Sequence, residues 1–216
     1  MTCLSSLADT LTPIVPDTSV LINLHACSFG ERVLCSLPNE IVVPEIVIAE
    51  LDHETSHANG ENDFIQNLIS RNFIKVVPLD DEAYRIFEAL ITSPCSLDDG
   101  EAAAIAVAAT RGFVPVIDER KGRAQAEAVM HGQSAAWSLD LLVHPAVQAG
   151  LPDGAYVEAV YMALSEGRMR VDEERCDAVV ALIGVERAIR CTSLPGFRSR
   201  QQIWASQTGS VKQASK

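Results

Sequence analysis

The stretch "IVPDTSVLIN", residues 14–23, decides the fold. A short β-branched run reaches Pro16, Asp17 follows, and a second apolar stretch begins after Thr18 and Ser19. This order is typical of a buried strand that gives way to a helix. Asp17 then stands at the end of a strand, where its carboxylate either caps the helix or supplies a charge that the protein needs there.

The same alternation of strand and helix patterns continues along the chain. The strands are predicted in "PIVPD" (13–17), "IVVP" (41–44), "FIKVVPL" (73–79) and "FVPVID" (113–118), with an edge strand in "SAAWS" (134–138). Helical patterns separate them, including one helix over 44–56 and a small-residue helix over 97–112. The alternation predicts an α/β fold with a central, mainly parallel sheet flanked by helices.

The C-terminal third changes character. Three helices in series are predicted over 139–150, 153–167 and 171–184, after which no sustained periodicity is left. We therefore expect a domain over residues 1–184 that includes these helices, followed by a flexible or loosely docked basic tail over 185–216.

Charge is unevenly distributed between these two parts. Of 29 acidic and 17 basic residues, residues 185–216 hold one acid and six bases. The remainder then carries 28 acids (29 less 1) and 11 bases (17 less 6), a charge of −17. Phosphate binding normally uses clusters of Lys and Arg, so the acidic balance argues against a general nucleic-acid-binding protein.

Cysteine usage and hydropathy indicate the compartment. The six cysteines are scattered without a CxxC pair, which favours reduced thiols over a disulfide framework. No apolar run approaches the roughly 18 residues that span a bilayer, and "MTCLSSLADTLTP" lacks the pattern of a signal peptide. A cytoplasmic protein without membrane contact is expected.

Four acids occupy analogous positions: Asp17 and Asp118 end strands, Glu50 lies in the helix after "VVP", and Glu101 opens the helix of "LDDGEAAAIA". Each could serve only as a cap, a solvated residue or a partner of the helix dipole. In an open α/β sheet, however, the carboxyl ends of the strands meet at one edge. Carboxylates that converge there repel each other, and Mg²⁺ or Mn²⁺ relieves the repulsion.

The residues around these acids resemble a known family. "VPDTSVLINL", "IVVPEIVIAEL", "LDDGEAAAIAVA" and "PVIDERKGRAQAE" are similar, in that order, to the four motifs of PIN domains, metal-dependent nucleases that include VapC-type toxins. The last two stretches are especially similar to a related subgroup of predicted nucleic-acid-binding proteins. The resemblance runs from about Ile14 to Gly184 and implies a PIN-like three-layer fold.

The resemblance also implies roles for individual residues. Asp17, Glu50, Glu101 and Asp118 match the catalytic, metal-binding acids, which would hold Mg²⁺ or Mn²⁺. The candidate accessory residues are Thr18, Ser19, Asp99 and Glu119, and the candidate RNA-binding residues are Arg120, Lys121 and Arg123. For each of these the simpler reading, a local hydrogen bond or a solvated charge, stays open.

Two departures from the family pattern bear on the site. Ala103 replaces a second acid that some relatives carry in the third motif, with Asp98 and Asp99 near enough to substitute. Trp137 and Ser138 stand where relatives often have Gly-Thr, which could narrow access for a substrate.

The function implied is that of a Mg²⁺- or Mn²⁺-dependent endoribonuclease, a hydrolase of RNA phosphodiester bonds. The family also makes a role in a toxin–antitoxin pair, an antitoxin partner and a homodimer open expectations. The alternative is a PIN-fold scaffold that binds a partner or RNA with weak or no nuclease activity. The complete set of acids favours the nuclease, whereas the acidic body favours the scaffold.

Overall fold

A parallel sheet organises the chain. The computed structural model describes residues 5–92, 94, 96–152 and 154–214, with side chains described as far as 206; Cys3 and Cys95 lie outside the described residues. The sheet order is β3-β2-β1-β4, and Ile14 pairs with both Ile41 and Val114. The strands are β1 (Ile14–Pro16), β2 (Ile41–Pro44), β3 (Ile74–Val77) and β4 (Val114–Val116).

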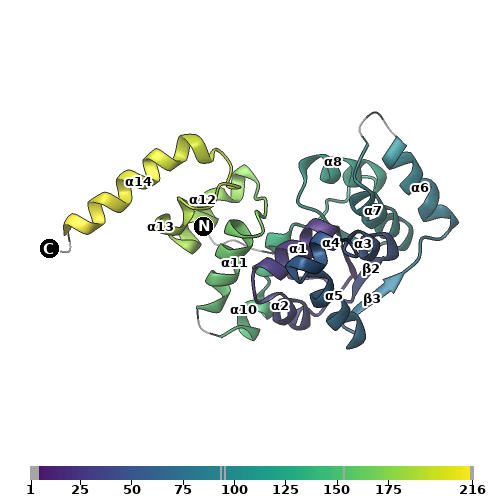
Figure 1. Ribbon diagram of the computed structural model, residues 1–216. Coiled ribbons are helices and arrows are strands. Elements are labelled where there is room, and N and C mark those ends of the chain that lie inside the picture. Colours follow the sequence, from purple (N-terminus) through teal and green to yellow (C-terminus); the bar gives the residue numbers. More distant parts are fainter. Residues whose placement is uncertain (1–4, 93, 95, 153, 215–216) are drawn as a thin grey trace.

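Helices cover both faces of the sheet (Figure 1). Along β1, Ile14 packs with α1 and the later helices, whereas Val15 packs against the small residues of α7. This alternation follows from the period of two in a strand, and it produces the three layers that the sequence predicts. The helices of the first part are α1 (Thr18–Ala26), α2 (Gly30–Ser36), α3 (Glu45–Glu50), α4 (Glu54–Asn59), α5 (Glu61–Ser70), α6 (Asp81–Thr92), α7 (Asp99–Arg111) and α8 (Arg120–Val129).

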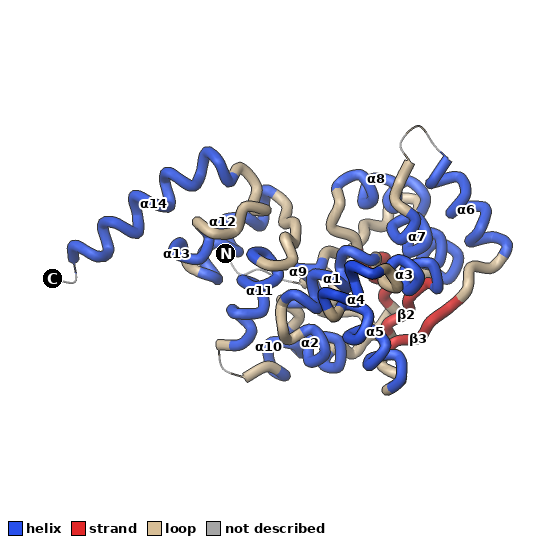
Figure 2. The backbone as a smooth tube through the Cα atoms, in the orientation of Figure 1, coloured by secondary structure: helices blue, strands red, loops and turns tan. Residues whose placement is uncertain are grey.

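The later helices lie largely on the side of the molecule away from β3 (Figures 1 and 2). They are α9 (Ser138–Leu142), α10 (Pro145–Gly150), α11 (Ala155–Ser165), α12 (Glu173–Ile183), α13 (Val185–Ala188) and α14 (Phe197–Ala214). None of the helices in the described part of the chain is both long and apolar enough to cross a membrane.

Three expectations about local structure differ from what is observed. The helix expected over 44–56 is divided into α3 and α4, and the side chain of Asn62 donates to the carbonyl of Leu51 at the break. The helix expected over 139–150 is divided before Pro145, because a residue that precedes proline avoids the helical conformation. The expected edge strand is a single bridge between Val116 and Ala136.

The segment after Gly184 also differs from an irregular tail. It forms α13 and α14, and Ala188, Cys191, Leu194 and Trp204 are buried in the main core. Figure 1 shows α14 extending outward from the rest of the molecule. The division of the chain into two parts at Gly184 stays a prediction.

Candidate active site

Asp17 lies at the end of β1 and caps the helix that follows. Its Oδ1 caps α1 by accepting from the Val20 N–H at 2.8 Å and from Ser19 Oγ at 2.9 Å. The side chain is buried, with the residue 1% exposed, and its Oδ2 has no partner within the described part of the chain. One oxygen therefore ends the strand and starts the helix, while the other is available to a ligand.

Glu50 is held at the last residue of α3 by two elements. Its Oε1 accepts from the Gly100 N–H at 2.8 Å, and its Oε2 accepts from the hydroxyl of Thr18. Gly100 makes this approach possible, because a Cβ at that position would lie 2.3 Å from Glu50 Oε2 and 2.4 Å from Thr18 Oγ1. The glycine of the "LDDGEA" motif thus has a steric reason.

Glu101 lies in the first turn of α7 and is buried, with 8% of the residue exposed. Its Oε1 has no partner among the described residues. Helix α8 passes close to it at Gly122, where a Cβ would lie 2.7 Å from Glu101 Oε1. Glu101 is therefore the second buried acid with an unpaired oxygen. It lies close enough to Asp17 for its charge to add to the rise of the Asp17 pKa.

Asp118 follows β4 and is bonded at both oxygens. The Ser138 N–H donates to Oδ1 at 2.8 Å, and Asn23 Nδ2 donates to Oδ2 at 2.8 Å. Asn23 was not predicted as a site residue. Its signal in the sequence is a lone amide between Val20 and Leu24 on the buried side of α1, where a polar group requires a partner.

These residues line three adjoining cavities. A cavity of about 510 Å³ is lined by Asp17, Glu50 and Glu101. Asp118 lines the neighbouring cavities of about 250 and 540 Å³ instead. The predicted accessory residues all border the first cavity, together with an acid that the sequence offered as a substitute: Thr18, Ser19, Asp98, Asp99 and Glu119.

The carboxylates are difficult to ionise together. Burial raises the pKa of Asp17 well above its usual value, and Asp118 and Glu101 add to the rise. Burial raises the pKa of Glu101 to about 7, with Glu119 and Asp98 adding to it. Burial also raises the pKa of Asp118 to about 6, although the hydrogen bonds from Ser138 and Asn23 oppose the rise. Such shifts concentrate at functional sites.

The predicted RNA-binding residues are not equivalent. Arg120 is exposed and lines the third cavity. Lys121 donates to the carbonyl of Ser96. Arg123 donates to the carbonyls of Ile117 and Ala136, and its guanidinium lies 3.9 Å from the centroid of the Trp137 ring. Arg123 is therefore engaged in holding the strand end.

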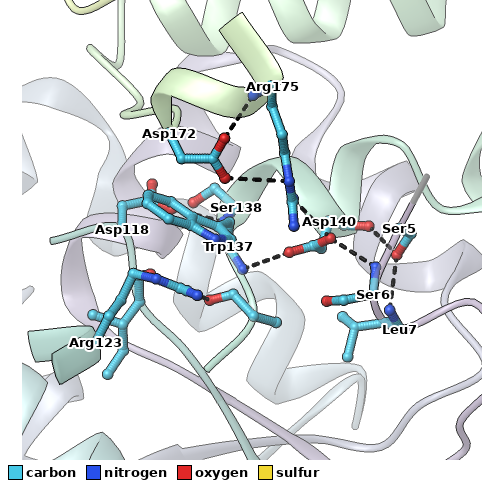
Figure 3. A network of polar contacts seen from close by, with 12 residues as sticks. Ser5, Ser6, Leu7, Asp118, Arg123, Trp137, Ser138, Asp140, Asp172 and Arg175 are labelled. Atoms are coloured by element: carbon cyan, nitrogen blue, oxygen red, sulfur yellow. Dashed lines mark hydrogen bonds and ion pairs between the residues drawn. The ribbon is translucent and has the colours of Figure 1, made fainter. Parts of the chain in front are cut away.

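A further buried acid, Asp140, supports the loop beside Asp118 (Figure 3). Asp140 is fully buried, and its Oδ2 accepts from the Trp137 N–H at 2.8 Å. Its Oδ1 accepts from the Ser6 N–H at 2.7 Å and from Arg175 Nη1 at 3.0 Å. This network fixes residues 137–138, and with them the Ser138 N–H, which donates to Asp118. The sequence contains no local signal for it.

The donor set fits a hard divalent cation. Carboxylate oxygens are the ligands that Mg²⁺ and Mn²⁺ prefer, and the unpaired oxygens of Asp17 and Glu101 are of this kind. As the side chains stand, no three acids, histidines or cysteines in the described ranges are grouped closely enough to hold a metal. Glu50 in particular is engaged by Thr18 and Gly100.

Comparison with known proteins identifies the family. A family model described as DUF3368, a PIN domain, matches residues 13–185. A search of curated proteins finds no match. The matched range contains the whole sheet and all four acids, and the four-stranded parallel order with helices on both faces agrees with the PIN fold, which is of nuclease type. The chain belongs to the PIN-domain family.

Proposed function

We propose that this protein is a Mg²⁺- or Mn²⁺-dependent endoribonuclease. The observation that carries the proposal is the pair of buried, unpaired carboxylate oxygens, on Asp17 and Glu101, in a PIN-domain chain. An unpaired buried charge is costly, and a bound cation or a proton removes the cost. In a site that served structure alone, protein donors would be expected to pair with both oxygens of each buried carboxylate.

The residues of the chain divide the work. Asp17, Glu50, Glu101 and Asp118 would hold the ion or ions. A bound divalent ion supplies Lewis-acid polarisation of a phosphodiester and lowers the pKa of an attacking water. Asn23 and the Ser138 N–H orient Asp118, and Gly100 and Thr18 orient Glu50. Such outer contacts fix the direction of ligand oxygens.

The acidic body does not exclude RNA. A cation neutralises part of the charge around the cavity, and the local distribution of charge decides binding more than the net value does. A toxin role with an antitoxin partner, and a homodimer, belong to this proposal as its narrower form. They rest on the resemblance of the four motifs to PIN domains, which include VapC-type toxins.

A PIN-fold scaffold that binds RNA or a protein is the second candidate. Two observations favour it: the charge of −12, and the absence of a ready metal-ligand group among the described side chains. The scaffold requires neither the unpaired oxygen of Asp17 nor that of Glu101. Metal-dependent cleavage separates the two candidates.

The experiment measures cleavage of a mixed single-stranded RNA with Mg²⁺, with Mn²⁺ and with EDTA. Asp17→Asn and Asp118→Asn are expected to lose cutting, and Asp63→Asn, an exposed acid of α5 outside the three cavities, is the matched control. A folded wild type that cuts no RNA with either metal supports the scaffold. Cutting that survives both site variants contradicts the assignment of the acids.

A further inference from the structure

The three cavities form one groove. The first and second share Ser19, Ile22 and Glu119 as lining residues. The second and third share Asp118 and Arg170. A polymer that reaches the acids of the first cavity can therefore continue through the second into the third without leaving the surface.

Charge changes sign along this groove. No Lys or Arg is found among the described residues that line the first cavity. Arg168 and Arg170 line the second, and Arg120, Arg123 and Arg170 line the third. Acids also border these two cavities. Asp118 lines both, and Glu119 lines the second, where it is paired with Arg170. In the third cavity Asp172 is paired with Arg175 and Glu173 with Arg200. A phosphate chain is thus attracted to one side of the acids only.

The loop between α11 and α12 is built to bring two arginines to this place. Gly167 lies against α1 so closely that a Cβ would come within 2.7 Å of Asn23 Oδ1. Met169 is fully buried and its N–H donates to the Ala163 carbonyl at 2.8 Å, while Arg168 and Arg170 on either side of it are exposed. The anchored methionine therefore leaves the two flanking arginines at the surface, and the Asn23 that Gly167 contacts is the residue that orients Asp118.

Both arginines are accessible to a phosphate. Arg170 Nη2 pairs with Glu119 Oε1 at 2.9 Å, with side-chain exposures of 61% and 43%. An ion pair this exposed contributes little, so a phosphate can replace Glu119. Within the described residues, Arg168 has no carboxylate partner.

Trp137 supplies an aromatic surface in the third cavity. Its ring is half-buried, and the Arg123 guanidinium covers one face (Figure 3). Aromatic rings that line a basic groove stack on unpaired bases of single strands with little preference for sequence. Trp137, which stands where relatives often have glycine, would then contribute to RNA binding by stacking.

We propose that Arg168 and Arg170 bind the phosphates of a single-stranded RNA on one side of the scissile bond, and that the next unpaired base stacks on Trp137. This substrate path rests on the proposed nuclease function. In this path the α11–α12 loop binds the RNA. Phosphates are bound on one side of the scissile bond only, because no Lys or Arg is found among the described residues that line the first cavity.

The first experiment measures binding of a fluorescent single-stranded RNA by anisotropy at several salt concentrations. The full chain carries Asp17→Asn throughout, so that the RNA stays intact. Replacing both loop arginines by Ala is expected to weaken binding roughly tenfold or more, and to flatten the plot of log Kd against log salt by about 1.4, or about 0.7 for each phosphate. The control replaces Arg32 and Arg85, exposed arginines outside the groove, and is expected to change neither quantity.

The second experiment reads the stacking directly. The chain has two tryptophans, so Trp204→Phe leaves Trp137 as the single tryptophan, which is excited selectively at wavelengths that the tyrosines do not absorb. RNA is expected to quench this emission, and Trp137→Leu is expected to weaken binding with no change in the salt slope. Emission that RNA leaves unchanged overturns the stacking step.

The outcomes separate this inference from the proposed function. A wild type that cuts RNA, combined with an unchanged salt slope in the double arginine variant, overturns the path and leaves the nuclease. Arginine-dependent binding by a wild type that cuts nothing supports the path and overturns the nuclease. A wild type that does not bind RNA overturns the path.

Discussion

Two groups of buried carboxylates, close together in the fold, are treated in opposite ways. Asp140 is fully buried, and both of its oxygens are bonded, to the N–H groups of Ser6 and Trp137 and to Arg175. Asp17 and Glu101 are also buried, yet each leaves an oxygen without a partner in the described part of the chain.

The difference teaches what each acid is for. A carboxylate that accepts hydrogen bonds from protein donors at both oxygens is stable where it is without a ligand. An unsaturated carboxylate in the same protein destabilises the fold until something binds to it. Burial alone therefore does not mark a functional acid. An open oxygen sets Asp17 and Glu101 apart from Asp140, whereas Asp118 and Glu50 would hold an ion through the second lone pairs of oxygens that already accept a hydrogen bond.

The largest effect on stability is expected for Asp140, the acid that is bonded at both oxygens. Asp140→Ala removes the fully buried carboxylate partner of Arg175, which keeps only Asp172, and frees three donors, so the free energy of unfolding should fall by about 3 kcal/mol. Urea unfolding measures it, with Asp177→Ala as the control, since that acid of α12 is exposed. A fall equal to the control's would mean that Asp140 does not hold the loop.

Substitution of Glu101, which has an open oxygen, should raise stability instead of lowering it. Glu101→Gln removes a charge that lacks a partner, so the metal-free protein should become more stable, while cleavage of RNA should fall about 100-fold or more. Thermal unfolding and initial rates measure the two effects. A variant that loses stability and activity together would place Glu101 in the same class as Asp140.

Gly100→Ala tests the geometry of the site without touching a charge. The new methyl would lie 2.3 Å from Glu50 Oε2, so the carboxylate must move, and activity should fall roughly tenfold. Ala is the better helix former by about 1 kcal/mol, so stability should be unchanged or higher. Gly112→Ala is unsuitable as a control because of its positive φ of 65°.

The smallest effect expected is on the pH dependence of stability. The folded pKa values of about 7 for Glu101 and about 6 for Asp118 exceed those of an unfolded chain, roughly 4. A raised folded pKa contributes stability below the unfolded pKa, and this contribution is lost as the pH rises through 6 and 7. In EDTA, Tm should therefore fall between pH 5.5 and 8. Glu101→Gln should make the fall of Tm with pH smaller, and Mg²⁺ at pH 8 should restore Tm. A wild-type Tm that does not change with pH would contradict the raised pKa values of Glu101 and Asp118.

The sequence was sufficient for the sheet and for the positions of the acids, for a physical reason. Asp17 and Asp118 each follow a β-branched run, and parallel strands bring their carboxyl ends to one edge. Asn23, Ser138 and Arg170 could not be found in this way, because their roles depend on contacts between elements far apart in the chain. Helix α14 was missed because Trp204 is the one residue buried among its described side chains, so no apolar face repeats along it.

The network at Asp140 has a consequence for the order in which the protein is completed. Its carboxylate joins Ser6, near the start of the chain, to Arg175, in α12. During synthesis the four acids and the strands of the sheet are all present once residue 118 is added, but this junction and the arginines of the α11–α12 loop follow later. A nascent chain therefore contains the four acids well before it can hold the loop beside Asp118 in place.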